Sequence, residues 1–570
     1  MTKVQQVSPF LTHVYVQPGS AYEDTQDKEK VSNQEPILIG ADEPCAVLLG
    51  VEERAFEKEL EAFKKLTEEM KVISSVKSLL DCDLQTYMPS QASDDRAWQM
   101  SYLTKCYYEV VTSQKMADLL KYLQDEVNLK KLNRLERILV REVGIEHEKL
   151  KKIPSNLVQE FTEVTSKAHH VWKKARATKR FDKFKPYLEK IFSIRCQMAE
   201  CIGYKGSPYN AFLDMYEEEI TTEELDKIFT KLKKELVPIV KTINNSTFKP
   251  DTSYLDREFS KEELKGGLRK RLKELSVDLL KQIHFDFSRG RLDKSAHPFS
   301  MLITKNDTRL TTRYKTLRDV ISTIMHEGGH GLYDQGVDPE LAKTPLSELT
   351  SLGVHESQSR LYEIMVGQGL PFWKYYYPKL QERFPEQLKN VSLEDFYKAM
   401  NAVKAIFIRN ESDEVTYNLH GIVRYETEKD RIEGRLQVQD IPKVWNQKMQ
   451  EYLGITPPND ALGCLQDVHW ACGDIGYFPT YTLGDLYKIQ FFNQAKKEIP
   501  NLEEEIAKGN QMVLREWLRE KIHKYGRTET PREIIERVTG RPFNVDQLVD
   551  DYIKYIKDKY GEIYGISNWG

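Results

Sequence analysis

Residues 221–236, TTEELDKIFTKLKKEL, show the pattern that decides the fold class of this chain. Apolar side chains return every three or four positions, which places them on one face of an α-helix: Leu225, Ile228, Phe229, Leu232 and Leu236. Thr221 and Glu224 have the spacing of a capping box, and Ser260 and Ser392 look like further helix starts. Because the same periodicity extends over most of the chain, the sequence predicts a mostly α-helical protein.

The first 55 residues differ from the rest. They lack helical periodicity and carry four basic and nine acidic side chains, which is unlike an Arg-rich organelle transit peptide. From residue 56 to residue 570 there is no internal repeat and no clear linker. We therefore expect an N-terminal extension of unknown role over residues 1–55 and one large helical domain over residues 56–570.

Composition excludes several classes of protein. The 84 basic and 88 acidic residues give a net charge of -4, which provides no strong field for nucleic acid or for an anionic membrane. No run approaches the roughly 20 apolar residues that span a bilayer. The seven cysteines are scattered and odd in number, which suits free thiols in a reducing compartment. We expect a cytoplasmic protein that binds neither nucleic acid nor membrane.

The stretch VISTIMHEGGHGLYDQG at residues 320–336 contains an HExxH motif. On a helix, His326 and His330 lie about 40° apart on one face, so both imidazoles can reach one zinc ion. Glu327 follows the first histidine and can serve as general base for a water on the metal. The adjacent Gly328 and Gly329 each cost about 1 kcal/mol in a helix interior, so we expect another backbone or a substrate to approach closely there.

A catalytic zinc site needs a third protein ligand and a position for water. Glu348, Glu356 and Glu363 all follow the motif in a helical-looking stretch, and spacing alone does not choose among them. Residues 296–318 are rich in β-branched side chains around a turn-prone Asn306-Asp307, which predicts a short hairpin just before the motif.

A polar stripe follows further downstream. Arg409, Asp413, Tyr417, His420 and Arg424 would fall within an arc of about 80° if residues 409–424 formed one α-helix. Such a stripe offers two cations for a carboxylate, with a phenol and an imidazole able to stabilise an oxyanion. A solvated helix face with ion pairs fits the same pattern equally well.

Together these pieces resemble the carboxypeptidase Taq family of zinc metallocarboxypeptidases over nearly all of residues 60–570. The HExxH and five other motifs, in order along the chain, carry the resemblance: residues 297–299 (HPF), 307–311 (DTRLT), 355–359 (HESQS), 408–420 (IRNESDEVTYNLH) and 463–470 (GCLQDVHW). The resemblance implies that Glu356 is the third ligand and Glu327 the general base. It also implies a deep substrate groove, a small β element near the metal, a homodimer, and broad preference for C-terminal residues other than proline.

The mechanism we expect is attack by zinc-bound water on the scissile carbonyl, with Glu327 first accepting the proton and then passing it to the leaving amine. One zinc ion per chain is expected, and cobalt could replace it. Arg409 is the first candidate to bind the terminal carboxylate of a short peptide, and Arg424 and Arg309 are the next candidates.

Other residues have expected roles around the reacting bond. Tyr417 and His420 are candidates for stabilising the oxyanion, while Asp467 and His469 are expected to line the groove or orient a neighbour. Two rival hypotheses are a zinc endopeptidase or oligopeptidase, which would also cut an amidated peptide, and a silent helical peptide-binding protein, in which Glu327 would be dispensable.

Overall fold

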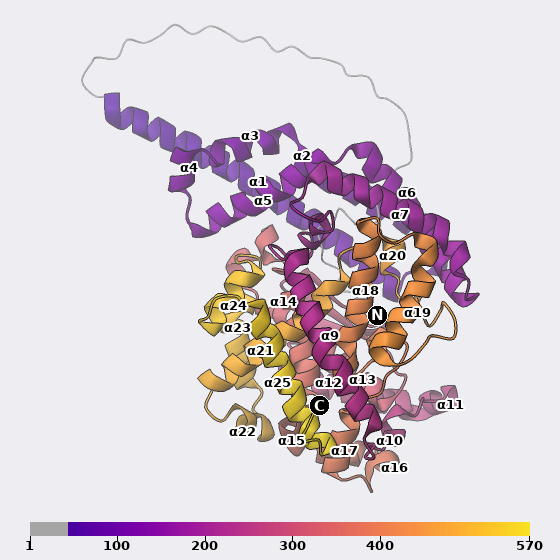
Figure 1. Cartoon of the computed structure of the whole chain (residues 1–570). Helices are drawn as coiled ribbons and strands as arrows, with labels where there is room; N and C mark the ends of the chain where they lie inside the picture. The colour runs from indigo at the N-terminus through magenta and orange to yellow at the C-terminus, as the bar shows by residue number, and fades with distance from the viewer. Residues whose placement is uncertain (1–43, 570) are drawn as a thin grey trace.

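The computed structural model describes residues 44–569, with side chains from residue 53 onward. Helices of the N-terminal third lie together as one layer across the end of the molecule (Figure 1). They are α1 (Pro44–Thr86), α2 (Ser93–Thr112), α3 (Gln114–Leu123), α4 (Glu126–Lys131), α5 (Arg134–Lys152), α6 (Ser155–Ala177) and α7 (Phe181–Ile202).

The remaining helices form the body beneath this layer. Its longer helices are α9 (Thr222–Asn245), α12 (Arg269–Gln282), α13 (Leu317–Gly336), α14 (Leu352–Arg360), α15 (Leu370–Arg383), α18 (Glu414–Ile432), α19 (Ile441–Leu453), α21 (Phe478–Glu498), α23 (Met512–Lys521), α24 (Pro531–Thr539) and α25 (Val545–Tyr564). The shorter ones are α8 (Asn210–Leu213), α10 (Ser253–Asp256), α11 (Lys261–Glu263), α16 (Pro385–Leu388), α17 (Leu393–Met400), α20 (His469–Cys472) and α22 (Leu502–Ala507). A π-helical turn, η5 (Leu361–Val366), continues α14.

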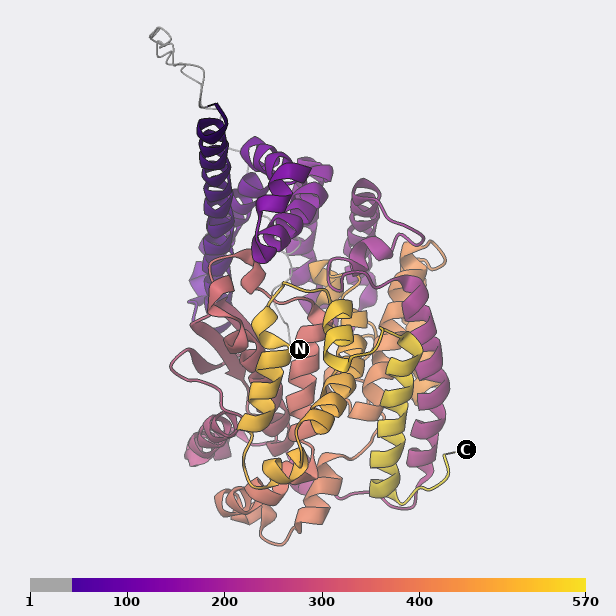
Figure 2. The same cartoon turned by 90° about the vertical axis from the view of Figure 1, so that its left-hand side faces the viewer.

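One small sheet interrupts the helices. Its strands β1 (Gly290–Lys294), β2 (Ser300–Thr304) and β3 (Asp307–Thr312) lie in the order β1-β3-β2, with β1 parallel and β2 antiparallel to β3. The sheet lies between α1 and α13, at the edge of the body seen in Figure 2. The predicted hairpin is confirmed as β2 and β3, but its turn residues are Lys305 and Asn306, because Asp307 already pairs with Thr304 as the first residue of β3.

A continuous apolar core joins the N-terminal layer to the body, from Phe56 in α1 to Tyr564 in α25. The mostly α-helical single domain is thereby confirmed. The capping boxes at Thr221 and Ser260 are present, and the Ser392 hydroxyl accepts the Asp395 N–H at the start of α17. None of the helices within residues 44–569 is both long and apolar enough for a transmembrane span.

The N-terminal boundary stays a prediction. Helix α1 begins at Pro44 and passes through residues 55 and 56 without a break, whereas residues 1–43 lie outside the described part of the chain.

Candidate metal centre and substrate site

Two helices cross closely at the HExxH motif. A Cβ atom on Gly329 of α13 would lie 2.7 Å from the Ser359 Cα and 2.9 Å from the Gln358 carbonyl carbon, both backbone atoms of α14. The predicted close approach of another backbone is therefore confirmed at Gly329. On the far side, Gly484 of α21 packs against Glu356 in the same way, with a Cβ position 2.8 Å from the Glu356 Cγ. These glycines let three helices meet around Glu356.

This crossing brings His326, His330 and Glu356 together. Their candidate ligand atoms all lie within 4.8 Å of one another, and the Glu356 Oε2 is 3.6 Å from the His326 Nε2 and 3.4 Å from the His330 Nε2. All three side chains are buried. The two Nε2 atoms and the Glu356 Oε1 have no hydrogen-bond partner among the described residues. Because such buried polar atoms are costly unless something binds them, the three residues fit a metal ion.

The other two glutamates that the spacing left open do not join the three candidate ligands. Glu363, in η5, accepts a hydrogen bond from His326 Nδ1 at 2.8 Å and another from Arg360 Nη1 at 2.8 Å. Burial alone would raise the pKa of Glu363, but Arg360 and His326 lower it to about 2. The anion therefore keeps the proton of His326 on Nδ1 and leaves Nε2 to face the site. Glu348 instead pairs with Lys71 of α1 at 3.4 Å.

Glu327 lies fully buried beside the same cluster. Neither of its carboxylate oxygens has a hydrogen-bond partner among the described residues. Burial raises the pKa of Glu327 to about 8. A carboxyl group with a pKa near neutrality can both accept and release a proton at physiological pH.

The predicted stripe at residues 409–424 is only partly helical. Helix α18 begins at Glu414, because the Asp413 carboxylate caps it by accepting the N–H groups of Val415 and Thr416. Arg409 therefore lies in the preceding 3₁₀ turn, and the prediction that it shares one helix with Tyr417 is wrong. The two side chains nevertheless meet, since Arg409 Nη1 donates to the Tyr417 hydroxyl at 3.0 Å.

The three candidate arginines differ in how their donors are occupied. Arg409 is buried, stacks 4.1 Å from the Tyr481 ring centroid and lies 3.5 Å from Asp467, yet its Nη2 has no hydrogen-bond partner in residues 53–569. Each nitrogen of Arg424 has a partner: Nε donates to Asp467, Nη1 to the His420 carbonyl and Nη2 to Gln466, each at 2.7 Å. Arg309 makes a two-fold contact with Asp307 on β3, away from this cluster.

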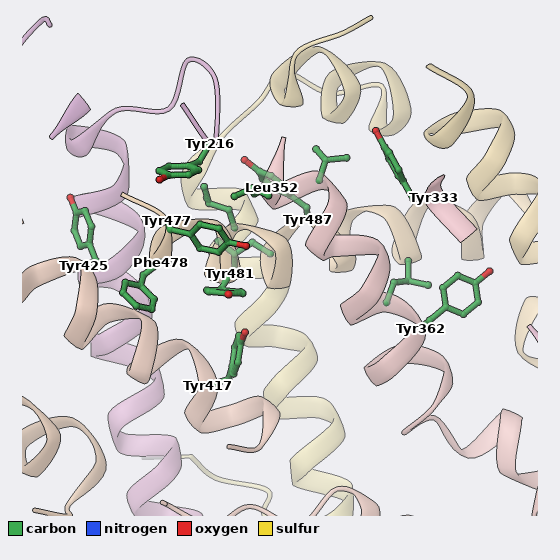
Figure 3. Packing of buried hydrophobic residues seen from close by; sticks show 14 of the residues in the cluster. Tyr216, Tyr333, Leu352, Tyr362, Tyr417, Tyr425, Tyr477, Phe478, Tyr481 and Tyr487 are labelled. Carbon is green, nitrogen blue, oxygen red and sulfur yellow. The ribbon is translucent and has the colours of Figure 1, made fainter. Parts of the chain in front are cut away.

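Three tyrosine rings pack together beside Arg409. Figure 3 shows Tyr417 below Tyr481 and Tyr477, and the centroid distances are 6.3 Å for Tyr417–Tyr481 and 5.2 Å for Tyr477–Tyr481. His469 lies 3.2 Å from the Tyr481 hydroxyl. Burial lowers the pKa of His420 well below its usual range, with Arg424 and Arg409 adding to the effect, so this imidazole is neutral.

A cavity of about 700 Å³ opens beside His326 and Tyr417, and neither Arg409 nor the other two candidate ligands belong to its lining. His326, Glu363, Arg360 and Tyr417 line the part nearest the metal ligands. The cavity provides the space next to the candidate site that a peptide requires.

The roles of several supporting residues were not predicted from the sequence. Examples are His355, which stacks on His330 at 4.3 Å and pairs with Asp334, and Arg360, which binds Glu363. Their roles follow from contacts between helices. The only indication in the sequence is that Arg360 and Glu363 are three residues apart, which is common on any helix surface.

Comparison with known proteins identifies the class. A profile of the carboxypeptidase Taq (M32) metallopeptidases matches residues 62–560. Carboxypeptidase 1 of Bacillus subtilis is 39% identical over 516 residues, which cover 90% of this chain and all of that protein. The crystal structure of an M32 carboxypeptidase from Deinococcus radiodurans has a TM-score of 0.83 at 34% identity, covering 89% of this chain and 100% of the other. A Pyrococcus furiosus carboxypeptidase structure also has a TM-score of 0.83, at 33% identity, covering 88% of this chain and 99% of the other.

The fold and these relatives define a metallopeptidase. The chain belongs to the carboxypeptidase Taq (M32) family and is a metallocarboxypeptidase.

Proposed function

We propose that this enzyme binds one zinc ion through His326, His330 and Glu356 and releases single C-terminal amino acids from short peptides. The observation that carries the proposal is the convergence of three buried side chains whose facing polar atoms have no partner among the described residues. Two imidazoles and one carboxylate form a ligand set that suits catalytic zinc and leaves a coordination position for water. Cobalt is a candidate substitute, since the ligand types do not select one metal.

Glu327 is the proposed general base and acid. A bound zinc ion supplies Lewis acidity and lowers the pKa of a water molecule beside the scissile carbonyl. Glu327 accepts a proton on its carboxylate as water adds to that carbonyl carbon, and donates it to the departing amine as the C–N bond breaks. Glu327 is buried beside the three proposed ligands and both its carboxylate oxygens lack a partner among the described residues, which supports its role in this proton transfer.

Arg409 is the proposed ligand for the terminal carboxylate of the peptide. Its unoccupied Nη2 supports this role, whereas Arg424 has its donors engaged and Arg309 is held by Asp307. We assign Arg424 and Asp467 to holding Arg409 in place, since the Asp467 carboxylate lies between the two guanidinium groups.

Oxyanion stabilisation is proposed for Tyr417 and His420. The Tyr417 hydroxyl accepts from Arg409 and so can direct its own proton toward the substrate. His469 is proposed to orient Tyr481, which stacks on Arg409.

An amidated peptide tests the exopeptidase proposal. Kinetics on a free-acid peptide and its C-terminal amide would be compared in wild type and Arg409→Gln. We expect wild type to lose at least about 10²-fold in kcat/KM on the amide, because a charge-assisted pair is lost in a buried site. Arg409→Gln should be slow on both peptides. Equal wild-type rates on the two peptides would favour the endopeptidase or oligopeptidase alternative.

The physiological range of substrates is also a proposal. We propose short peptides with broad preference at the C-terminal position, excluding proline, which a panel of tripeptides differing in that residue would test. Unhindered release of C-terminal proline would contradict the exclusion.

We propose a homodimer in the cytoplasm. Large apolar side chains are exposed on α1 and α2, including Val72, Val76, Trp98 and Tyr102, and such side chains are typical of protein interfaces. The six cysteines whose side chains the structure describes are not joined by disulfides, which suits a reducing compartment. Sedimentation of wild type and Trp98→Asp at micromolar concentration tests the dimer, and a monomeric wild type would contradict it.

A further inference from the structure

A line of buried charges leads away from the metal-ligand cluster. It begins at His326, whose Nδ1 donates to Glu363, and Glu363 accepts from Arg360 at 2.8 Å. Arg360 Nε donates in turn to Asp485 of α21, also at 2.8 Å. These contacts join α13, η5, α14 and α21, the elements that carry or support the candidate ligands.

The line continues beyond Asp485. Lys488, one helical turn later on α21, lies 2.7 Å from the Asp485 Oδ1 and 2.9 Å from the Glu414 Oε1. Glu414, the first residue of α18, also pairs with Lys559 of α25 at 2.8 Å. Charges therefore alternate without interruption from Glu363 to Lys559.

Burial makes this arrangement costly to disturb. The side chains of Asp485, Lys488 and Glu414 are 0% exposed, and Arg360 is 5% exposed. Removing one member leaves its neighbour as an unpaired buried charge. The neighbouring side chains must then rearrange, or the free energy of unfolding falls by several kcal/mol. A surface network would not impose such a constraint.

The line also touches the proposed substrate side of the site. Asn418 of α18 donates to Asp485 at 3.2 Å, and the Arg360 guanidinium lies 4.4 Å from the Tyr417 ring centroid. Asp485 therefore contacts α18, which carries Tyr417. Through Arg360 it is also connected to Glu363, which accepts the hydrogen bond from His326. One carboxylate connects two sets of functional groups.

We propose that Asp485 and Lys488 are positioning residues, which hold Arg360 and Glu363 so that His326 keeps its metal-binding orientation. This inference rests on the proposed metal site. Asp485 acts through Arg360, to which it is hydrogen-bonded, and Lys488 acts through Asp485. Partners of metal-bound histidines change metal affinity by about 10- to 100-fold when they are altered.

The test measures metal release rather than turnover. Zinc-loaded protein would be mixed with excess chelator, and the visible absorption of the cobalt-loaded form would report ligand geometry. Asp485→Asn keeps the shape of the side chain and removes its charge. The double variant Asp485→Asn with Lys488→Met removes one charge of each sign and so preserves neutrality, which buried pairs tolerate better than single removals.

We expect both variants to release zinc about tenfold faster than wild type and to show a shifted cobalt spectrum. Glu142→Gln is the control, because it removes a buried carboxylate of α5 that pairs with the partly exposed Arg527 at 2.9 Å, and it should release zinc at the wild-type rate. Folded variants with wild-type release rates and spectra would overturn the inference. If wild type itself binds no zinc, or if His330→Ala binds it unchanged, the proposed metal site fails instead.

Discussion

Gly329→Ala tests the helix crossing that assembles the ligand cluster. The new methyl group would lie 2.7 Å from the Ser359 Cα, whereas ordinary contact begins at 3.4 Å. Both elements present backbone at this point, and the Gln358 carbonyl oxygen lies closer still, so α13 and α14 must separate by at least about 0.7 Å. Metal–ligand distances tolerate only about 0.2 Å. We therefore expect zinc affinity to fall by at least about tenfold and kcat/KM by about 10²-fold.

Stability gives a second measure of the same substitution. Overpacking costs about 1–3 kcal/mol, and the better helix propensity of alanine returns about 1 kcal/mol, so a net loss of about 1 kcal/mol is expected from denaturant unfolding. Gly144→Ala on α5 is the matched control. Its methyl group would lie 2.6 Å from the Gln124 Nε2, the end of a flexible side chain that can move aside. Wild-type zinc affinity in Gly329→Ala would refute the reasoning.

Three further outcomes are expected. Burial raises the pKa of Glu217 to about 7, so between about pH 4.5 and pH 7 the folded state holds a proton that the unfolded state has lost. The free energy of unfolding should therefore fall by up to about 3 kcal/mol as the pH rises through this range. In Glu217→Gln, thermal unfolding at a series of pH values should show a smaller fall. Asp467→Asn leaves Arg424 buried without its carboxylate and should lower the free energy of unfolding by about 3–5 kcal/mol, measured by urea titration. Removing the metal with a chelator should lower the melting temperature. Zinc at 100 times its Kd should then raise the free energy of unfolding by about 2.7 kcal/mol, and an unchanged melting temperature would contradict metal binding by the folded state.

Much of the fold and part of the site follow from local sequence patterns. The helix carrying His326 and His330, the capped start at Thr221 and the hairpin before the motif all depend on residues close together in the chain. Hydrophobic periodicity, capping and turn chemistry act over such short separations. These features could therefore be predicted from sequence.

Features that depend on contacts between distant segments could not. Spacing left Glu348, Glu356 and Glu363 open, because only the crossing of α13 with α14 decides which carboxylate faces the histidines. The helical projection of Arg409 was wrong because Asp413 caps α18 four residues later. The partner of Arg360 lies 125 residues away on α21, beyond any local pattern.

The most direct test of the account is time-resolved mass spectrometry of one free-acid peptide incubated with zinc-loaded wild type and with Glu327→Gln. We expect wild type to remove single residues in order from the C-terminus and Glu327→Gln to lose at least about 10²-fold in rate, since it has no group to carry the proton. Internal cleavage by wild type, or an undiminished rate in Glu327→Gln, would contradict the account.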